Sequence, residues 1–469
     1  MRRATLRRAA ALWLLLFGVY AATIGLPTEP GSDYAGDEPH FLLTTKSIVE
    51  DHNADLLDEY RTRDYREIYP RDLRARGRVT AQGQVNEPHG LGFPLLIAPA
   101  YAIGGPKAVE VFLAAIAALA IVLAYALALR VVPDPWAIGA ALLGGLSPPV
   151  LGWATAVYPA LPAGAALAGA VLLALKLTER RSRLLVFGCF FLIGMLPWLA
   201  TPFILAAAVV AALTARLLWS QRRRMLAIGG LEVVGFSLAF YAGLNEGFFG
   251  GLTPYAAQLP DDSPTGADTA ADYLDRAYRF VALWIDRDYG LLRWAPLFLL
   301  AWIGLWFVWR EWRGGLARVI PELQAEEFAA AMCASVVGAQ LLIAVLLAPT
   351  MFGFWFPGRH LMPALPLMIP LVAIGLRRAP RLGAVLGGIG MIASVWLYVD
   401  VRWGDATIAA GRPDAPWGPL EVAWPDYSDG AALPYVIAAL VAVAVAAAFF
   451  VDPRVWRRLL RRERAATTA

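Results

Sequence analysis

The stretch GSDYAGDEPHFLLTTKSIVE, residues 31–50, places two adjacent carboxylates, Asp37 and Glu38, shortly after a first hydrophobic span. Asp37 has the position of a helix N-cap. Apolar residues then recur at helical spacing, which predicts an amphipathic helix over 38–51 on the membrane surface. Asp37 and His40 share one face of that helix, while Glu38 points elsewhere. Asp37 is therefore either a plain helix cap or a functional carboxylate, and the surrounding chain bears on the choice.

The composition is that of a membrane protein. Of the 469 residues, 59% are hydrophobic and 17% charged, and the mean hydropathy is +0.55. Long apolar runs separated by short charged segments predict an all-α polytopic protein. The net charge of +4 gives no indication of a nucleic-acid partner, because the basic residues cluster between spans. Cys189 and Cys333 both lie within apolar runs, which argues against a structural disulfide or a thiol-bound metal.

We predict a single membrane domain over 1–469 with about twelve transmembrane helices. The predicted spans are 9–26, 107–130, 136–152, 159–177, 184–200, 202–218, 226–243, 294–309, 328–348, 361–376, 382–400 and 433–451. Arginine clusters occur in every second connecting segment, as the positive-inside rule requires. This pattern places both termini in the cytoplasm of a plasma (inner) membrane protein.

The four substantial polar loops then all lie on the extracytoplasmic side: 28–106, 244–293, 349–360 and 401–432. All four histidines fall in these loops, and no Walker-type nucleotide motif occurs in the sequence. The first loop is expected to contain surface helices and, at 91–105, an apolar segment too short to span, which we interpret as re-entrant or interfacial. The Gly- and Pro-rich part of the second loop, 250–272, is either a lid or a linker. Any chemistry should face the extracytoplasmic side.

An extracytoplasmic enzyme without ATP needs a substrate that arrives already activated, and a sugar on a polyprenyl phosphate is such a donor. Transfer requires a carboxylate to accept the proton of the attacking hydroxyl. It also requires cations, with or without a metal ion, to stabilise the departing lipid phosphate. Asp37 and Glu38 are the candidate carboxylates. The candidate cations for the donor phosphate are Lys46, Arg287, Arg293, Arg359 and His360.

The chain resembles the GT-C superfamily of polyprenyl-phosphate-sugar glycosyltransferases, which includes protein O-mannosyltransferases, the lipid A aminoarabinose transferase and actinobacterial arabinosyltransferases. Asp37-Glu38 matches the acidic motif of the family's first extracytoplasmic loop. Residues 87–94 occupy the place of its Pro-containing re-entry motif, with Glu-Pro-His instead of a Lys-Pro-Pro or His-Pro-Pro sequence. Residues 358–363, GRHLMP, correspond to the stretch that opens a late span near the lipid phosphate.

The resemblance implies an inverting hexosyl- or pentosyltransferase with Asp37 as base and Arg359 near the phosphate. The partners would be the lipid bilayer, a polyprenyl-phosphate sugar and an acceptor hydroxyl on a glycan, a lipid or a protein. The departure at the re-entry motif leaves three roles open for His89: phosphate contact, metal ligation or loop positioning.

Further residues are weaker candidates for the site. Glu87, His89 and Tyr289 are candidates for positioning the substrate or the loops. A divalent metal ion is a candidate cofactor, because Asp37, His40, Glu87 and His89 would offer mixed oxygen and nitrogen ligands of the kind that suit Mn²⁺, Mg²⁺ or Zn²⁺. The residues around Arg287 can equally form local ion pairs, and Lys46 and Arg359 can equally contact lipid headgroups.

Two other classes of function compete with the enzyme: a transporter or lipid flippase, and a non-catalytic membrane scaffold. A transporter usually places ionisable groups near the midplane and is often built from repeats. We find no convincing half-to-half repeat in the sequence and almost no ionisable residue in the middle of a predicted span, Glu232 near a cytoplasmic end being the exception. A glycan ligase or polymerase with a diphosphate donor is a closer variant of the enzyme.

Overall fold

The structure, a computed structural model, describes residues 3–80, 83–259, 265–267, 269–314, 321–352, 358–408, 423–428 and 430–451. Within these ranges the chain forms helices and a few isolated β-bridges, and no strand is present. The predicted all-α polytopic class is confirmed. Part of the predicted loop 401–432, part of the loop 250–272 and the C-terminal segment 452–469 lie outside the described residues.

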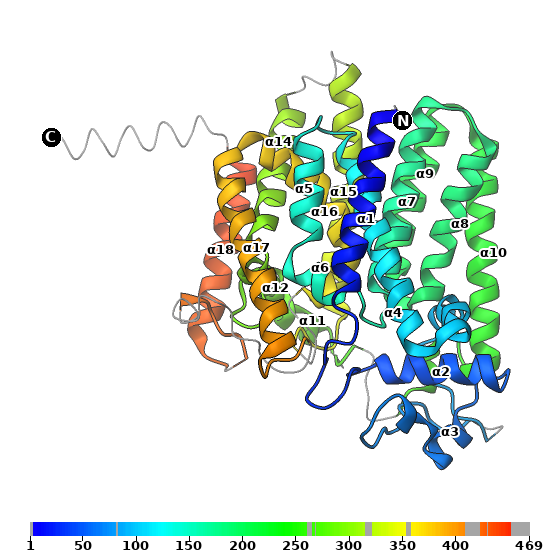
Figure 1. The fold of residues 1–469 in the computed structure, drawn as a ribbon. Helices are drawn as coiled ribbons and strands as arrows, with labels where there is room; N and C mark the ends of the chain where they lie inside the picture. The colour runs from blue at the N-terminus through cyan, green and yellow to red at the C-terminus, as the bar shows by residue number, and fades with distance from the viewer. Residues whose placement is uncertain are drawn as a thin grey trace.

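The helices run in the order shown in Figure 1. They are α1 Arg3–Ala21, α2 Glu38–Glu50, α3 Leu57–Thr62, η1 Asp64–Glu67, α4 Gly92–Ala128, α5 Trp136–Gly145, α6 Pro148–Trp153, α7 Ala160–Glu179, α8 Arg183–Leu199, η2 Thr201–Phe203, α9 Ile204–Ser220, α10 Arg224–Phe249, η3 Pro254–Ala257, α11 Ala270–Asp275, η4 Arg276–Tyr278, α12 Arg279–Ile285, α13 Leu291–Trp294, η5 Pro296–Phe298, α14 Leu299–Gly314, α15 Pro321–Leu342, the π-helical turn η7 Ile343–Leu347, η8 Arg359–Ala364, α16 Leu365–Arg378, α17 Pro380–Trp403 and α18 Ala432–Phe450.

Every predicted span coincides with a helix or a pair of helices, but not all of them are long enough to cross a bilayer alone. Among the described residues, nine helical segments are long and apolar enough to span. The predicted spans at 136–152, 184–200 and 294–309 are not in that set. The first is split into α5 and α6 before Pro148-Pro149, and α8 and α14 have 17 and 16 residues. The total of twelve stays a prediction.

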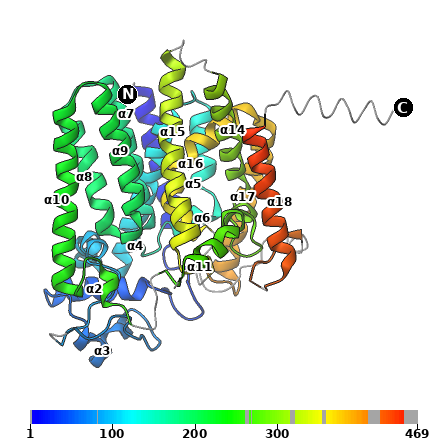
Figure 2. The same cartoon turned by 180° about the vertical axis from the view of Figure 1, so that it is seen from behind.

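The long helices form a bundle that runs from the end carrying the N-terminus to an opposite end covered by α2 and α3 (Figures 1 and 2). α7 and α16 are almost entirely buried and form its centre, whereas α10 and α18 lie at its edges. α14 packs closely on α16 because each of the two helices presents a glycine to the backbone of the other. A Cβ at Gly304 would lie 2.0 Å from the Leu371 carbonyl oxygen, and one at Gly375 would lie 2.2 Å from that of Leu300.

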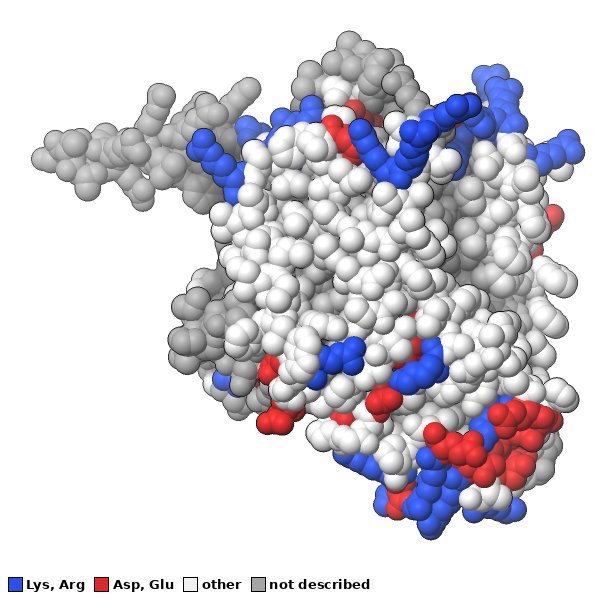
Figure 3. All heavy atoms as spheres, in the orientation of Figure 1, with Lys and Arg blue, Asp and Glu red and all other residues white. Residues whose placement is uncertain are grey.

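Charged residues separate to the two ends of this bundle. On the face shown in Figure 3, Lys and Arg gather around the end that carries the N-terminus, and Asp and Glu concentrate with other basic residues at the end that carries α2 and α3. This separation is the arrangement from which the cytoplasmic position of the termini was predicted.

The predicted helix over 38–51 is confirmed as α2, Glu38–Glu50, but its surroundings differ from the prediction. An amphipathic surface helix should expose one face, yet all residues from Glu38 to Ser47 are buried. α4 covers one side of α2, and the first loop folds over the other through residues such as Leu56 and Tyr65. The loop is therefore a small packed cap, and the polar side chains of α2 point into protein instead of water.

The apolar segment 91–105 is helical and continues into the second span as one bent element, α4. The bend lies at Gly104-Gly105, where Gly105 has φ +63° and ψ −155°, and Pro106 follows directly. A Gly-Gly-Pro sequence explains the break, since glycine adopts this conformation without strain and proline removes a helical donor. The second leg, 106–128, matches the predicted span 107–130. Re-entry of the first leg into a membrane stays a prediction.

Candidate active site

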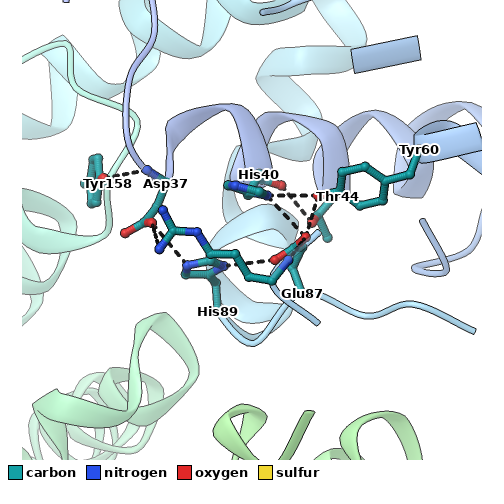
Figure 4. A network of polar contacts seen from close by, with 8 residues as sticks. Asp37, His40, Thr44, Tyr60, Glu87, His89 and Tyr158 are labelled. Carbon is teal, nitrogen blue, oxygen red and sulfur yellow. Dashed lines mark hydrogen bonds and ion pairs between the residues drawn. The ribbon is translucent and has the colours of Figure 1, made fainter. Parts of the chain in front are cut away.

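Asp37 occupies the N-cap position of α2, but its side chain does not cap the helix. Its carboxylate makes no hydrogen bond to the described first-turn amides. Oδ1 instead lies 3.0 Å from Nη1 of Arg76 and 3.5 Å from Nε2 of His89. The Asp37 backbone N–H donates to the Tyr158 hydroxyl at 2.9 Å. Figure 4 shows this arrangement, which favours the functional interpretation of Asp37 over the plain cap.

Glu87 is the second buried carboxylate of the network, and it comes from the Glu-Pro-His sequence at 87–89. Its Oε1 lies 3.2 Å from Nδ1 of His40, accepts a hydrogen bond from the Tyr60 hydroxyl, and accepts another from the Arg76 backbone N–H at 3.2 Å. Its Oε2 lies 3.8 Å from Nδ1 of His89. Glu87 therefore lies on the Nδ1 side of the His89 ring, whose other nitrogen faces Asp37.

Both carboxylates are held in their ionised forms. Burial alone would raise the pKa of Asp37, but the charge and hydrogen bond of His89, followed by Arg76 and Arg359, hold it well below its usual range. For Glu87, burial is likewise outweighed by His40 and then His89, which lower its pKa to about 2. Asp37 is therefore a proton acceptor that is always available at neutral pH, although a weak one.

Glu38, predicted beside Asp37 as a catalytic carboxylate, points away from it. Its Oε2 accepts from the Ala35 N–H at 2.9 Å and its Oε1 accepts from the Val157 N–H at 2.8 Å. The side chain is buried, and Glu38 is not among the described residues that line the cavity presented below. Glu38 ties the start of α2 to the segment before α7, which carries Tyr158. These contacts are structural.

Replacing Glu38 with Gln should therefore leave the chemistry of this site intact and change the stability of the fold. Burial raises the pKa of Glu38 to about 8 from 4.5, against the two backbone donors. Ionisation of Glu38 then opposes folding, so wild-type stability should fall as pH rises from about 4.5 to about 8. Thermal unfolding of Glu38→Gln in detergent should lose this part of the pH dependence, at a cost of about 1 kcal/mol for one lost acceptor. A large loss of turnover in folded Glu38→Gln would contradict the assignment.

Asp37 lies at one end of a cavity of about 830 Å³. Its polar lining residues are Asp37, Arg76, His89, Tyr158, Thr201, Tyr255, Gln258, Thr265, Gln340, Arg359 and His360. The remaining wall is largely apolar and comes from α6, α9, η7 and the segments beside them, including Trp153, Leu205 and Leu347. Asp37 is the one acidic residue among the described residues of this lining. A negatively charged headgroup with an attached apolar chain fits such a surface.

Arg359 and His360 reach this cavity from η8. Gly358, at φ +86°, turns the chain directly before Arg359. His360 donates from Nε2 to the Thr350 carbonyl at 2.8 Å, and its own carbonyl accepts from Gln340 at 2.9 Å, so its position is fixed by backbone contacts. No ion pair or hydrogen bond engages the Arg359 guanidinium within the described part of the chain. Arg359 is a cation at the cavity wall that can bind an anion.

The first and second loops are joined by backbone hydrogen bonds next to Arg76, which lines the cavity. The Arg78 N–H donates to the Ala257 carbonyl at 2.7 Å, and the Leu259 N–H donates to the Arg76 carbonyl at 3.3 Å. This short β-type pairing places Tyr255 and Gln258 in the lining, beside Arg76. The part of the loop at 260–264, which belongs to the predicted lid, lies outside the described residues.

Four of the predicted residues lie elsewhere. Lys46 pairs with Glu67 at 2.6 Å and with Glu50 at 3.9 Å, inside the first loop. Arg287 pairs with Asp426 at 2.5 Å, and Arg293 lies 3.6 Å from Asp288. Tyr289 contacts Phe352. None of these four is among the described residues that line the cavity. Arg287 therefore takes part in an ion pair, which is one of the alternatives that the sequence left open for it.

Sequence reasoning missed Arg76 and Tyr158. Arg76 belongs to the charge-dense stretch after α2, where one arginine among many has no local signature. Tyr158 stands in an apolar connection before α7, and its contact with Asp37 depends on the fold.

The four predicted metal ligands do come together, but as a chain of pairs. The order is His40, Glu87, His89 and Asp37, with each side chain facing the next. Within the described ranges, no group of three His, Cys, Asp or Glu residues is placed to hold one metal ion. The arrangement does not fit a shared metal centre, and a divalent cofactor stays a prediction.

Comparisons with known proteins give only distant likenesses. No family model matches the chain, and no characterised protein sequence matches it. Its fold is similar to the Archaeoglobus fulgidus oligosaccharyltransferase in the apo form, with a TM-score of 0.46 and 13% identity over 88% of this chain and 59% of that one. It is also similar to archaeal oligosaccharyltransferase AglB from Archaeoglobus fulgidus in complex with an inhibitory peptide and a dolichol-phosphate, with a TM-score of 0.45 and 14% identity over 87% of this chain and 57% of that one. The chain thus spans less than two thirds of either structure's length. Likenesses this distant assign no activity to it.

Proposed function

We propose that the protein is an inverting membrane glycosyltransferase of GT-C type, which transfers a sugar from a polyprenyl-phosphate donor to an acceptor hydroxyl. One observation carries the proposal: a single cavity holds an ionised carboxylate, Asp37, and a guanidinium available for an anion, Arg359, between apolar walls. The resemblance of the sequence around both residues to the GT-C motifs supports the same conclusion.

In the proposed reaction, the acceptor oxygen attacks the anomeric carbon from the face opposite the phosphate. The new bond joins that carbon to the acceptor oxygen, and the bond that breaks joins it to the phosphate oxygen. Asp37 accepts the hydroxyl proton, while Arg359 stabilises the lipid phosphate that leaves as an anion. A base of low pKa suits a proton transfer that occurs late, once the acceptor oxygen has begun to bond to the anomeric carbon and its proton has become acidic. His89 lies between Glu87 and Asp37, with one ring nitrogen toward each, and its charge favours the ionised form of the base.

α2 lies at the end of the bundle opposite the N-terminus (Figure 1), and Asp37, which directly precedes α2, lines the cavity. We propose that this end faces the extracytoplasmic side of the plasma membrane and that both termini are cytoplasmic, in agreement with the charge separation. The donor would then be made in the cytoplasm and delivered across the bilayer before it reaches the site.

The direct test is release or transfer of label from a panel of polyprenyl-phosphate sugars by the purified protein. Turnover of one donor would support the proposal and identify the sugar. If folded protein neither turns over nor binds any donor of the panel, the proposal is wrong, and a transporter or scaffold becomes the better interpretation.

Removal of divalent metal ions is expected to leave this turnover unchanged. The four side chains predicted as ligands face one another in successive pairs, and within the described residues no three of them converge on one point where an ion could bind. The assay in the presence and absence of EDTA measures this. Loss of turnover that Mn²⁺, Mg²⁺ or Zn²⁺ restores would instead establish the metal site predicted from the sequence.

A further inference from the structure

Two buried arginines, Arg276 and Arg279, lie behind one wall of the cavity and take no part in the mechanism described above. Arg276 belongs to η4 and Arg279 begins α12, so the two side chains are three residues apart and share one face. Both η4 and α12 pack against η7, the turn that ends α15. The two residues are 6% and 8% exposed, a degree of burial that arginine seldom reaches unless its charge is paired.

Both guanidinium groups donate to backbone carbonyls at the end of η7. Nη1 of Arg276 donates to the Leu346 carbonyl at 2.9 Å. Arg279 donates from Nη1 to the Ala348 carbonyl at 2.6 Å and from Nη2 to the Pro349 carbonyl at 3.3 Å. Ala348 and Pro349 line the cavity. Because the carbonyls that end a helix lack intrahelical partners and carry partial negative charge, the two arginines neutralise a helix end that borders the cavity.

Arg276 also holds the second loop against this helix end. Its Nη2 donates to the Gly266 carbonyl at 2.5 Å. Gly266 lies against Pro349, since a Cβ at Gly266 would be 3.6 Å from the Pro349 Cβ. Thr265, directly before Gly266, lines the cavity. One side chain therefore joins two segments of the cavity wall that are far apart in the sequence.

The charges of these two arginines are not neutralised by acidic side chains. Within the part of the chain that the structure describes, neither guanidinium forms an ion pair with a carboxylate. Carbonyl groups satisfy their hydrogen bonds and leave the positive charges in place, because arginine stays protonated even when it is buried. Thr350, which follows Pro349, accepts from His360, and His360 adjoins Arg359. Three guanidinium charges are thus gathered at the end of the cavity that contains Arg359.

We propose that Arg276 and Arg279 are positioning residues for the phosphate-binding end of the cavity, where they hold η7 and the second loop in place and increase the affinity for the anionic headgroup at Arg359. This inference rests on the proposed function and adds two residues to its anion site. Without the arginines, the negative end of η7 would repel a phosphate beside it. With them, the wall attracts the phosphate, although neither arginine is among the described residues that line the cavity.

An electrostatic contribution of this kind depends on the charge of the ligand. Polyprenol is neutral, and the sugar donor is a phosphodiester with one negative charge. The released polyprenyl phosphate is a monoester with nearly two negative charges at pH 7. Because Coulomb energy is proportional to that charge, the fold-change in Kd for the donor should be squared for the monoester. A purely structural effect would change the Kd of all three ligands alike.

The experiment measures the Kd of these three ligands for purified Arg279→Gln with no acceptor present. Glutamine can still donate to a carbonyl, but it has no charge. Its Kd should rise about three-fold for the donor and about ten-fold for polyprenyl phosphate, and should stay unchanged for polyprenol. Arg279→Lys should restore most of the affinity, because it restores the charge. Arg293→Gln is the matched control: Arg293 is equally buried but lies 3.6 Å from Asp288 and outside the described cavity lining, so no Kd should change.

Equal changes for all three ligands, or no change for any of them, would overturn the inference. A loss of affinity in Arg279→Lys as large as that in Arg279→Gln would do the same. If thermal unfolding shows that Arg279→Gln does not fold, Arg276→Gln gives the same comparison, because its guanidinium adjoins the same helix end. Wild-type protein that binds polyprenyl phosphate no more tightly than polyprenol would instead contradict the proposed function itself.

Discussion

Asp37→Asn is expected to lower kcat for sugar transfer by about 10²–10⁴-fold, the usual contribution of a positioned general base. Asparagine has nearly the shape of aspartate and can still accept from Arg76, but it cannot take the acceptor's proton. Binding of the donor should change little, because the donor phosphate is expected at Arg359. The measurement is a comparison of kcat and donor KM for purified wild type and variant.

Glu38→Gln is the matched control for this experiment. It changes the adjacent carboxylate in the same way, yet Glu38 bonds to backbone amides instead of facing the cavity. Turnover that survives in Asp37→Asn at the level of Glu38→Gln would show that Asp37 is not the base, even if the protein is a glycosyltransferase.

Arg359→Gln is expected to lower kcat/KM for the donor by about 100-fold. Removing one donor group that stabilises developing negative charge typically costs 10²–10³-fold, and here the charge develops on the leaving phosphate. Arg359→Lys should recover part of the loss, since it restores the charge but not the planar pair of donors. The effect should be smaller for donor analogues without the phosphate charge.

Arg287→Gln provides the comparison, because sequence analysis placed Arg287 in the same role. Arg287 is held by Asp426 and is not among the described cavity residues, so its loss should leave the donor KM unchanged. If Arg287→Gln and Arg359→Gln raised the donor KM equally, the position of the phosphate in this proposal would be wrong.

The sequence predicted the structure correctly where a local pattern of residues is the physical cause of that structure. Hydrophobic length and arginine spacing predicted the helical membrane fold, and the Asp-Glu-Pro-His sequence correctly predicted the start of α2. The same patterns predicted exposure for α2, which is in fact buried, because Leu56 and Tyr65, which lie beyond the helix and outside its local pattern, pack over it.

Charged side chains were harder to place. Lys46 and Arg287 have the same local features as Arg359, and only the fold decides that the first two meet carboxylates. Arg76 shows the opposite failure: a residue in an apparently solvated stretch reaches Asp37. The choice of partner depends on distances between loops, which the local spacing of residues does not contain.

The backbone pairing between the first and second loops involves Arg76, and the same residue helps to set the pKa of Asp37. Arg76 contacts Asp37 with its side chain and the second loop with its backbone, so one residue participates in both interactions. If the second loop moves away and takes Arg76 with it, the proton affinity of Asp37 rises, because one of the charges that keeps its pKa low is withdrawn. By thermodynamic reciprocity, protonation of Asp37 in turn favours the open loop. In the proposed reaction, a proton on Asp37 would weaken its attraction for Arg76, the residue whose backbone carbonyl accepts from the second loop.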